Sequence, residues 1–389
     1  MSTTNPPTSV PSATPVAGRE AVATNAGELP AAAQSLSRGD LGTALLHAMY
    51  PDDPAHTQAL SQLARAAMPL VDGPSAGIFF GAPALTFVLH TAGWTGPTMA
   101  HLDQALATHT TARLAAAHQR IDTEQTAHFG EYDLMHGLAG IGALLLVRST
   151  DPETTRALLT YLVRLTEPLR ATADEPDPGW QVWHHHSDLE RPWPHANAGL
   201  AHGITGPLAV LSLAVQRGVR VPGDLAAIDR ILDWLDTQRR SGDGWARWSG
   251  DHQPGPLAPS WCYGTPGIAR AQQLAAIAIG DQQRKNQVET LLADSLTSCL
   301  TDPAPTSDLV GDGICHGPAG VLQTVRRVAA DADDPSVFNQ HIEHWTARVR
   351  AAGEPRRAGL LEGTPGLRLV LDHPPHPQTP AWDACLGLA

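Results

Sequence analysis

The sequence predicts an all-α protein built as an α/α toroid of about seven helix-pair repeats. Three observations predict this fold: a short glycine turn recurs seven times, an apolar run follows most turns, and amphipathic segments lie between them. Successive turns are 42, 56, 66, 61, 53 and 46 residues apart, which is enough chain for two helices in each unit. The turns begin at Gly39, Gly81, Gly137, Gly203, Gly264, Gly317 and Gly363.

The runs that follow the turns are apolar on most faces, which is typical of buried helices. They include residues 141–147, 207–215, 268–279 and 321–328. We expect these runs to form inner helices that surround a central axis.

The segments between the inner helices are amphipathic and predict outer helices. In residues 225–239, Ile228, Ile231 and Leu235 recur at helical spacing, with Asp and Arg on the opposite face. The same pattern occurs in residues 157–169, 288–300 and 336–350.

Two stretches depart from the repeat. Residues 1–34 are rich in Ser, Thr, Pro and Ala, which predicts a disordered tail and leaves residues 35–389 as one toroidal catalytic domain. Residues 175–195 read as a long loop, with a short strand at 180–184. The loop contains the run His184-His185-His186, but consecutive residues rarely converge on one ion, so we interpret it as a contact loop rather than a metal site.

Composition excludes several classes of protein. The net charge is −13 and no basic block stands out, so we expect no nucleic-acid partner. Four cysteines in 389 residues are too few for a disulfide framework. No charged, apolar-cored leader and no apolar run of about 18 residues is present, so we expect a soluble, cytoplasmic protein without a membrane span.

The residue just before each turn defines a position that is equivalent in all units, and so does the residue one step earlier, which is Cys262 in one unit and Cys315 in the next. Seven such residues in a toroid should form a ring at one end of the axis, and neighbouring units should bring Cys262 close to Cys315 and His316. His202 should face the same centre. The seven residues are Arg38, Phe80, His136, His202, Tyr263, His316 and Glu362.

Cys262, Cys315 and His316 have the side chains that Zn²⁺ prefers, and three protein ligands leave the open position typical of a catalytic zinc. Two alternatives are open. Cysteine is often a small buried apolar residue, and Cys299 could complete a closed structural site. Cys299 lies on the apolar side of a predicted outer helix, however, and we expect it to pack away from the axis. Cys385 is expected to be buried.

Four segments of the chain resemble the lanthionine synthetase C-like (LanC) family, the cyclases of class I lanthipeptide biosynthesis, and they occur in the same order. The resemblance covers nearly all of the chain after about residue 35. The segments are Asp133-Leu134-Met135-His136-Gly137, Ala201-His202-Gly203-Ile204-Thr205-Gly206, Trp261-Cys262-Tyr263-Gly264-Thr265-Pro266-Gly267 and Gly313-Ile314-Cys315-His316-Gly317.

The resemblance implies a toroid with catalytic zinc, held by Cys262, Cys315 and His316. It implies His202 as the acid/base residue, with Asp133 and Tyr263 beside it. The implied reaction adds a peptide Cys thiol to a dehydroalanine or dehydrobutyrine of the same peptide. A dehydrated precursor peptide is then the substrate, and a dehydratase and a peptide exporter are candidate partners.

One position departs from the family. Members often carry an Arg four residues before the first zinc cysteine, where this chain has Ala258. We expect another group, such as Arg38 or Arg191, to replace that guanidinium if the reaction needs one.

Three other functions are compatible with parts of the pattern. The chain could be a non-catalytic scaffold that binds a modified peptide, although such a protein would be free to lose the zinc ligands and His202. It could add a small thiol to dehydroamino acids in proteins. A glycan-acting α/α barrel is disfavoured, because that chemistry needs two acidic residues around the bond and this ring offers mainly thiols and imidazoles.

Overall fold

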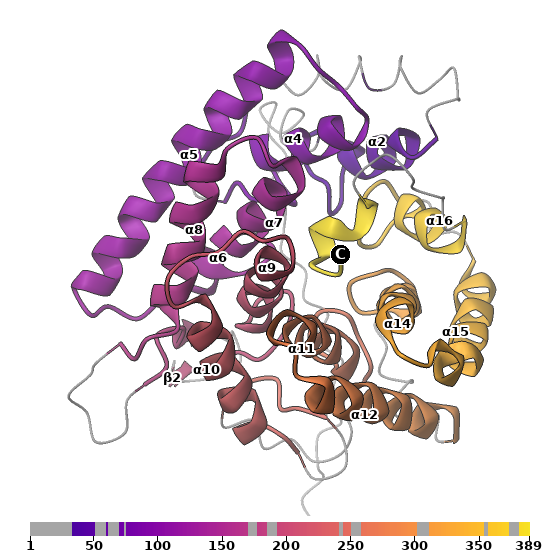
Figure 1. The fold of residues 1–389 in the computed structure, drawn as a ribbon. Helices are drawn as coiled ribbons and strands as arrows, with labels where there is room; N and C mark the ends of the chain where they lie inside the picture. The colour runs from indigo at the N-terminus through magenta and orange to yellow at the C-terminus, as the bar shows by residue number, and fades with distance from the viewer. Residues whose placement is uncertain are drawn as a thin grey trace, which may run out of the picture.

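The computed structural model describes residues 33–50, 60, 70–73, 75–169, 177–184, 193–240, 244–249, 258–301, 311–353, 357–372 and 381–389. Residues 1–32, most of the predicted tail, therefore lie outside the described residues. The described part is helical apart from one short hairpin and isolated bridges, and Figure 1 shows the helices arranged as a double ring.

Seven helices of the described part form the inner ring, and each begins one or two residues after the first glycine of a predicted turn. Each contacts the next one along the chain, and the last contacts the first, so the ring is closed. The inner helices are α2 (Asp40–Ala48), α4 (Ala82–Thr91), α7 (Leu138–Arg148), α9 (Thr205–Gln216), α11 (Thr265–Ile279), α14 (Pro318–Asp331) and α16 (Thr364–Asp372).

The outer helices pack against the inner helices that precede them in the chain, as Figure 1 shows. They are α5 (Pro97–Asp122), α8 (Pro152–Leu165), α10 (Asp224–Thr237), α12 (Gln282–Thr301) and α15 (Asn339–Ala352), the last preceded by the 3₁₀ helix η1 (Pro335–Phe338). Two predicted starts were wrong. Helix α8 begins five residues earlier than expected because Asp151 caps the amide of Thr154 and Pro152 opens the first turn. Helix α12 begins six residues earlier.

Six of the seven turns have a second glycine, which lets the helix start against the segment that precedes it; the turn at Gly81 has Ala84 at that position. A Cβ at Gly267 would lie 2.0 Å from the carbonyl oxygen of Trp261, and one at Gly320 would lie 1.9 Å from that of Ile314. A larger residue would force these segments apart. The glycine turns are therefore needed for close packing as well as for chain reversal.

Backbone hydrogen bonds join the segments just before the turns from one unit to the next. Leu134 donates to Ala201 at 3.1 Å, and Ala201 donates to Cys262 at 3.2 Å. Leu361 donates to Ser37 at 3.1 Å, which joins the last unit to the first. These contacts fix the register between units, so equivalent residues meet at one end of the ring.

The C-terminal residues 381–389 lie inside the ring, where Figure 1 marks the C-terminus. The 3₁₀ helix η2 (Trp382–Leu386) is buried and contacts α7. Trp261 Nε1 donates to the carbonyl of Leu386 at 3.0 Å, and Arg270 donates to that of Leu388 at 2.8 Å. The chain end is therefore part of the core.

The predicted loop at residues 175–195 contains a hairpin in its described part. Strand β1 (Val182–His184) pairs with β2 (Trp193–His195) in antiparallel register, which confirms the expected strand. Trp180 is buried and packs edge-on against Trp234 of α10, with ring centroids 5.4 Å apart. The His184–His186 side chains and Arg191 lie outside the described residues. No described helix is long and apolar enough to cross a membrane.

Candidate metal centre and acid/base pair

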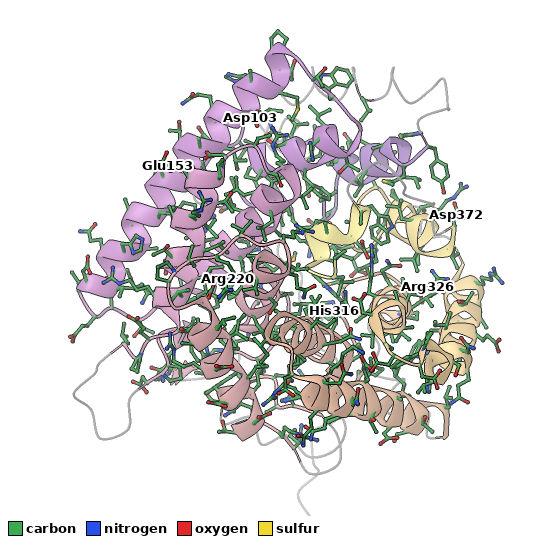
Figure 2. The ribbon with its side chains drawn as sticks, in the orientation of Figure 1. Asp103, Glu153, Arg220, His316, Arg326 and Asp372 are labelled. Carbon is green, nitrogen blue, oxygen red and sulfur yellow. The ribbon has the colours of Figure 1, made fainter. Side chains whose placement is uncertain are left out.

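Cys262, Cys315 and His316 come together in front of α11 and α14, because each lies just before the turn that opens its helix. Their candidate ligand atoms all lie within 4.8 Å of one another. Cys262 is buried, Cys315 is half-buried and His316 is exposed, so the group is accessible from one side. Figure 2 shows His316 in the interior of the ring. Two sulfurs and one imidazole nitrogen at this separation fit a Zn²⁺ ion.

The charges within this cluster favour a cation. A hydrogen bond from the Cys315 thiol, followed by one from His316, lowers the pKa of Cys262 well below its usual value. The same contact with Cys262, together with burial, raises the pKa of Cys315, and the contact with Cys262 raises the pKa of His316. The anionic form is therefore favoured most at Cys262, and cation binding would release the protons that remain on the ligands.

The two other cysteines lie elsewhere. Cys299 is buried on the outer helix α12, as expected, and is not a member of the cluster. Cys385 is fully buried in η2, where its thiol donates to the carbonyl of Trp382 at 3.3 Å. The structure thus gives no support to a closed site with Cys299 as a fourth ligand.

His202 and Asp133 form a pair between two neighbouring units. His202 lies just before α9, and Asp133 lies just before α7. His202 Nδ1 donates to Asp133 Oδ2 at 2.6 Å, and Asp133 Oδ1 accepts the amides of His136 and Gly137, both at 2.7 Å. Asp133 is fully buried, whereas 28% of the His202 side chain is exposed. Because a carboxylate only accepts hydrogen bonds, the pair fixes the proton on Nδ1 and leaves Nε2 as the exchanging nitrogen.

Aromatic rings connect His202 to the cysteine cluster. The His136 and His202 rings stack with centroids 6.0 Å apart, and the rings of His202 and Tyr263 are 6.2 Å apart. Tyr263 directly follows Cys262 in the chain. His136, His202 and Tyr263 each lie just before a turn, so these side chains follow the predicted ring of equivalent positions toward the cysteine cluster.

Tyr263 is oriented by Asn197, whose Nδ2 donates to the Tyr263 hydroxyl at 3.2 Å. Burial raises the pKa of Tyr263 to about 12, so the hydroxyl keeps its proton at neutral pH. Asn197 could not be identified from the sequence, because it lies six residues before its turn and belongs to no repeated position. His136 was not expected to have a role, although its position just before a turn could have indicated one.

Two guanidinium groups lie near the cluster. Arg38 is exposed and acts electrostatically on Cys315 and Glu362, and Arg247 does so on His316. Ala258, where the family often has an Arg, is half-buried. Arg247 was not anticipated, since it lies on the segment after α10 rather than beside a turn. Burial raises the pKa of Glu362, the ring residue between Arg38 and His316.

Comparisons with known proteins agree with this architecture. The nisin biosynthesis protein NisC of Lactococcus lactis subsp. lactis is 22% identical over 259 residues, which is 62% of this chain and 60% of that protein. The chain thus matches less than two thirds of that relative's length. A solved structure of nisin cyclase superposes with a TM-score of 0.75, at 17% identity and over 92% of each chain, which shows the same fold.

The family comparison covers almost the entire ring. A family model described as "Lanthionine synthetase C-like protein" matches residues 30–386, a span that includes all seven inner helices, the cysteine cluster and the His202–Asp133 pair. The chain belongs to the lanthionine synthetase C-like family.

Proposed function

We propose that this protein is a zinc-dependent cyclase that adds peptide Cys thiols to dehydroalanine or dehydrobutyrine residues of the same peptide, forming (methyl)lanthionine rings. The observation that carries the proposal is the joint placement of a Cys262–Cys315–His316 donor set and a His202–Asp133 pair at one end of the ring. The family membership and the similarity to nisin cyclase support it.

Cys262, Cys315 and His316 would hold the zinc ion, and the bound ion would supply the Lewis acidity that lowers the pKa of a substrate thiol. Two thiolates and one imidazole would neutralise the charge of the ion. The substrate sulfur would therefore stay nucleophilic, which suits addition to an alkene better than a histidine-rich site would.

His202 would carry the proton through the reaction. Its Nε2 takes the proton from the substrate thiol, and the resulting imidazolium is stabilised by Asp133. Attack of the sulfur on the β-carbon leaves an enolate, and His202 returns the proton to the α-carbon. Thus the S–H bond and the π bond of the alkene are replaced by one C–S bond and one C–H bond, and no other reactant is needed.

Tyr263 would stabilise the enolate. Because Asn197 donates to its oxygen, the Tyr263 O–H proton is directed toward another acceptor. The enolate oxygen is such an acceptor, and a donor aimed at developing charge lowers the barrier. Arg38 and Arg247 are the candidates for the guanidinium absent at Ala258.

The experiment combines metal analysis with a thiol count. The purified protein is expected to contain about one zinc per chain, which Cys315→Ala loses. Cys299→Ala is the matched control and should keep the metal, because Cys299 lies outside the cluster. Wild-type protein should consume the thiols of a dehydrated peptide, as measured by alkylation and mass spectrometry, since cyclisation itself changes no mass. Full cyclisation by a metal-free wild-type protein would contradict the proposal.

The same assay distinguishes the alternatives. A scaffold would bind the peptide and leave its thiols titratable. A small-thiol transferase would consume the alkene only when glutathione is added, with the corresponding gain in mass. The cytoplasmic location and the dehydratase and exporter partners remain predictions from the sequence.

A further inference from the structure

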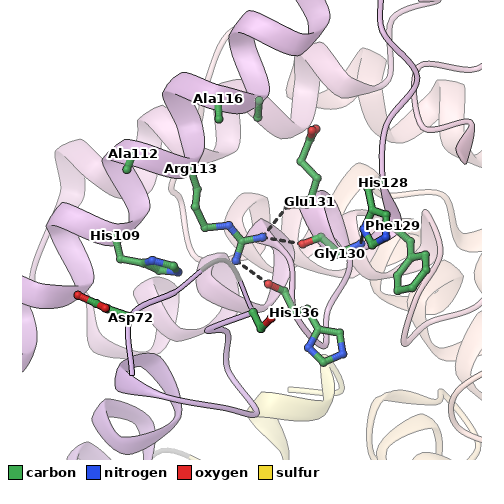
Figure 3. Close-up of a pocket in the computed structure, with 12 residues that line it drawn as sticks. Asp72, His109, Ala112, Arg113, Ala116, His128, Phe129, Gly130, Glu131 and His136 are labelled. Carbon is green, nitrogen blue, oxygen red and sulfur yellow. Dashed lines mark hydrogen bonds between the residues drawn. The ribbon is translucent and has the colours of Figure 1, made fainter. Parts of the chain in front are cut away.

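A pocket of about 690 Å³ lies between α5 and the segment that carries the site residues. Ala112 and Ala116 of α5 form one wall, and His128, Phe129 and His136 form the facing wall, as Figure 3 shows. Such a volume is within the range of protein pockets that bind ligands. The pocket is separate from the cysteine cluster but adjoins His202.

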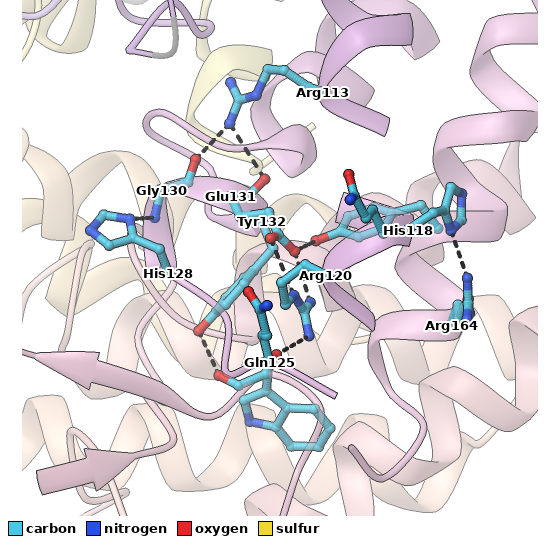
Figure 4. A network of polar contacts seen from close by, with 12 residues as sticks. Arg113, His118, Arg120, Gln125, His128, Gly130, Glu131, Tyr132 and Arg164 are labelled. Atoms are coloured by element: carbon cyan, nitrogen blue, oxygen red, sulfur yellow. Dashed lines mark hydrogen bonds and ion pairs between the residues drawn. The ribbon is translucent and has the colours of Figure 1, made fainter. Parts of the chain in front are cut away.

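The walls of the pocket are held in place by Arg113 of α5, which hydrogen-bonds to the facing segment. The Arg113 guanidinium donates to the carbonyls of Gly130 and His136, both at 2.6 Å, and to that of Ala76 at 3.0 Å. Behind this wall, Glu131 binds Arg120 at 2.8 Å and the Tyr161 hydroxyl at 2.7 Å (Figure 4). These charged groups are engaged in holding the segment in place.

The pocket is open at α5 because two positions of that helix carry only alanine side chains. Ala112 and Ala116 lie one helical turn apart and are exposed, so at these two positions of the wall α5 presents only methyl groups, beside His109 and Arg113. A longer side chain at either position would enter the pocket without disturbing the core.

The pocket continues to the acid/base pair through two shared residues. Phe129 packs edge-on against the His202 ring, with centroids 5.4 Å apart, and His136 stacks on the same ring at 6.0 Å. A chain that reaches His202 from this side must therefore pass over Phe129 and His136.

The polar groups at the rim suit a peptide backbone. His128 Nδ1 accepts the amide of Gly130 at 3.1 Å, so Nε2 carries the proton and is a hydrogen-bond donor. Asp72 is exposed at the rim and supplies an acceptor. His128 and Asp72 thus offer a donor and an acceptor beside Phe129 and the alanine wall, and an extended polypeptide, with its alternating C=O and N–H groups, can satisfy both.

We propose that this α5 pocket binds the stretch of the substrate peptide that flanks the reacting residues. The inference rests on the proposed function. Because the thiol and the alkene belong to one peptide, the peptide must extend out of the site on both sides of the reacting residues. Holding a flank against α5 would place the reacting residues beside His202 and reduce the entropy lost on ring closure.

Three synthetic peptides test the proposal. The short peptide contains dehydroalanine and Cys with blocked ends, and the extended peptides add about six residues, or about 20 Å of chain, on one side or the other. Wild-type protein is expected to cyclise one extended peptide with a KM about tenfold below that of the short peptide. A non-reactive extended peptide with Ser in place of Cys gives the corresponding Kd by fluorescence anisotropy.

Ala112→Trp and Ala116→Trp fill the pocket and should abolish the preference for the extended peptide, in both KM and Kd. Their kcat/KM for the short peptide and their zinc content should equal those of the wild type. Ala115→Trp is the matched control, because Ala115 is exposed on the same helix and does not line the pocket. It should keep the preference.

The inference is overturned if wild-type protein cyclises the short and extended peptides equally well, or if the pocket-filling variants retain the preference. A different result would reject the proposed function itself: wild-type protein that holds zinc but cyclises neither peptide. The two failures are thus distinguishable in one set of assays.

Discussion

Two buried carboxylates of this molecule have the same burial and different partners. Asp133, before α7, binds His202, and Asp383, in η2, binds Arg327 of α14. In each pair the aspartate is fully buried and 28% of the partner side chain is exposed. Asp383 also accepts from Gln323 at 2.7 Å, whereas Asp133 accepts two backbone amides.

The difference lies in the partner's ability to change charge. A guanidinium stays protonated at every accessible pH, so the Asp383–Arg327 pair is a fixed contact that holds the C-terminal segment in the ring. An imidazole can be neutral or protonated, and Asp133 can accept a hydrogen bond from Nδ1 in both states. Asp383 and Asp133 are equally buried, but we expect Asp383 to anchor the C-terminal segment and Asp133 to support proton transfer by His202.

The largest effect is expected from Asp133→Asn. An Asn oxygen can still accept the amides of His136 and Gly137, but its NH₂ then faces His202 and forces the proton onto Nε2. By analogy with other carboxylate–histidine pairs, cyclisation should fall by about 10²–10⁴-fold. Zinc content and the unfolding midpoint should stay close to wild type. A variant with unimpaired cyclisation would remove Asp133 from the mechanism.

Asp383→Ala should act on stability instead. It leaves Arg327 and Gln323 without their acceptor, at a cost of about 2–3 kcal/mol; this is below the loss for a wholly buried pair because Arg327 reaches solvent. Urea unfolding measures the loss, and the folded fraction should cyclise peptide at the wild-type rate. The double variant Asp383→Leu, Arg327→Met is the control and should recover most of the stability. A strong fall in the rate of the folded protein would contradict a purely anchoring role.

His341 extends the comparison to a buried imidazole whose described hydrogen bond is to the side-chain amide of Gln340 rather than to a carboxylate. Burial, followed by the charge of His344, lowers the pKa of His341 on α15. The unfolded chain then binds more protons below about pH 6.5, so stability falls as the pH drops. His341→Leu should flatten this decline by about 1.4 kcal/mol for each unit of pKa shift. Thermal unfolding between pH 7 and 5 measures it, and an unchanged slope would refute the assignment.

The smallest effect is expected from Asp122→Asn. Asp122 pairs with Arg164, and 61% of the Asp122 side chain and 33% of the Arg164 side chain are exposed. Solvent screens such a pair, so the loss should be about 0.2–1 kcal/mol in urea unfolding. A loss as large as that of Asp383→Ala would show that burial of the carboxylate does not control these energies.

Much of the fold could be predicted from the sequence because its signals are local. A glycine turn followed by an apolar run determines where an inner helix begins, and all seven predicted starts agree with the structure within two residues. Helix boundaries on the outer layer were less accurate, since α8 depends on the Asp151 cap rather than on its apolar face. The equivalent position before each turn likewise indicated that Cys262, Cys315 and His316 would meet.

The sequence by itself determined the repeat register and the side chains available at the ring. Only the tertiary structure decided that Asp133 binds His202 across 69 residues of chain, that the C-terminus enters the ring, and that Arg113 frames a pocket beside the site. These contacts depend on the rotation of each helix about its axis and on side-chain direction after ring closure. A sequence period specifies which face of a helix is buried, but it does not specify which neighbour that face meets.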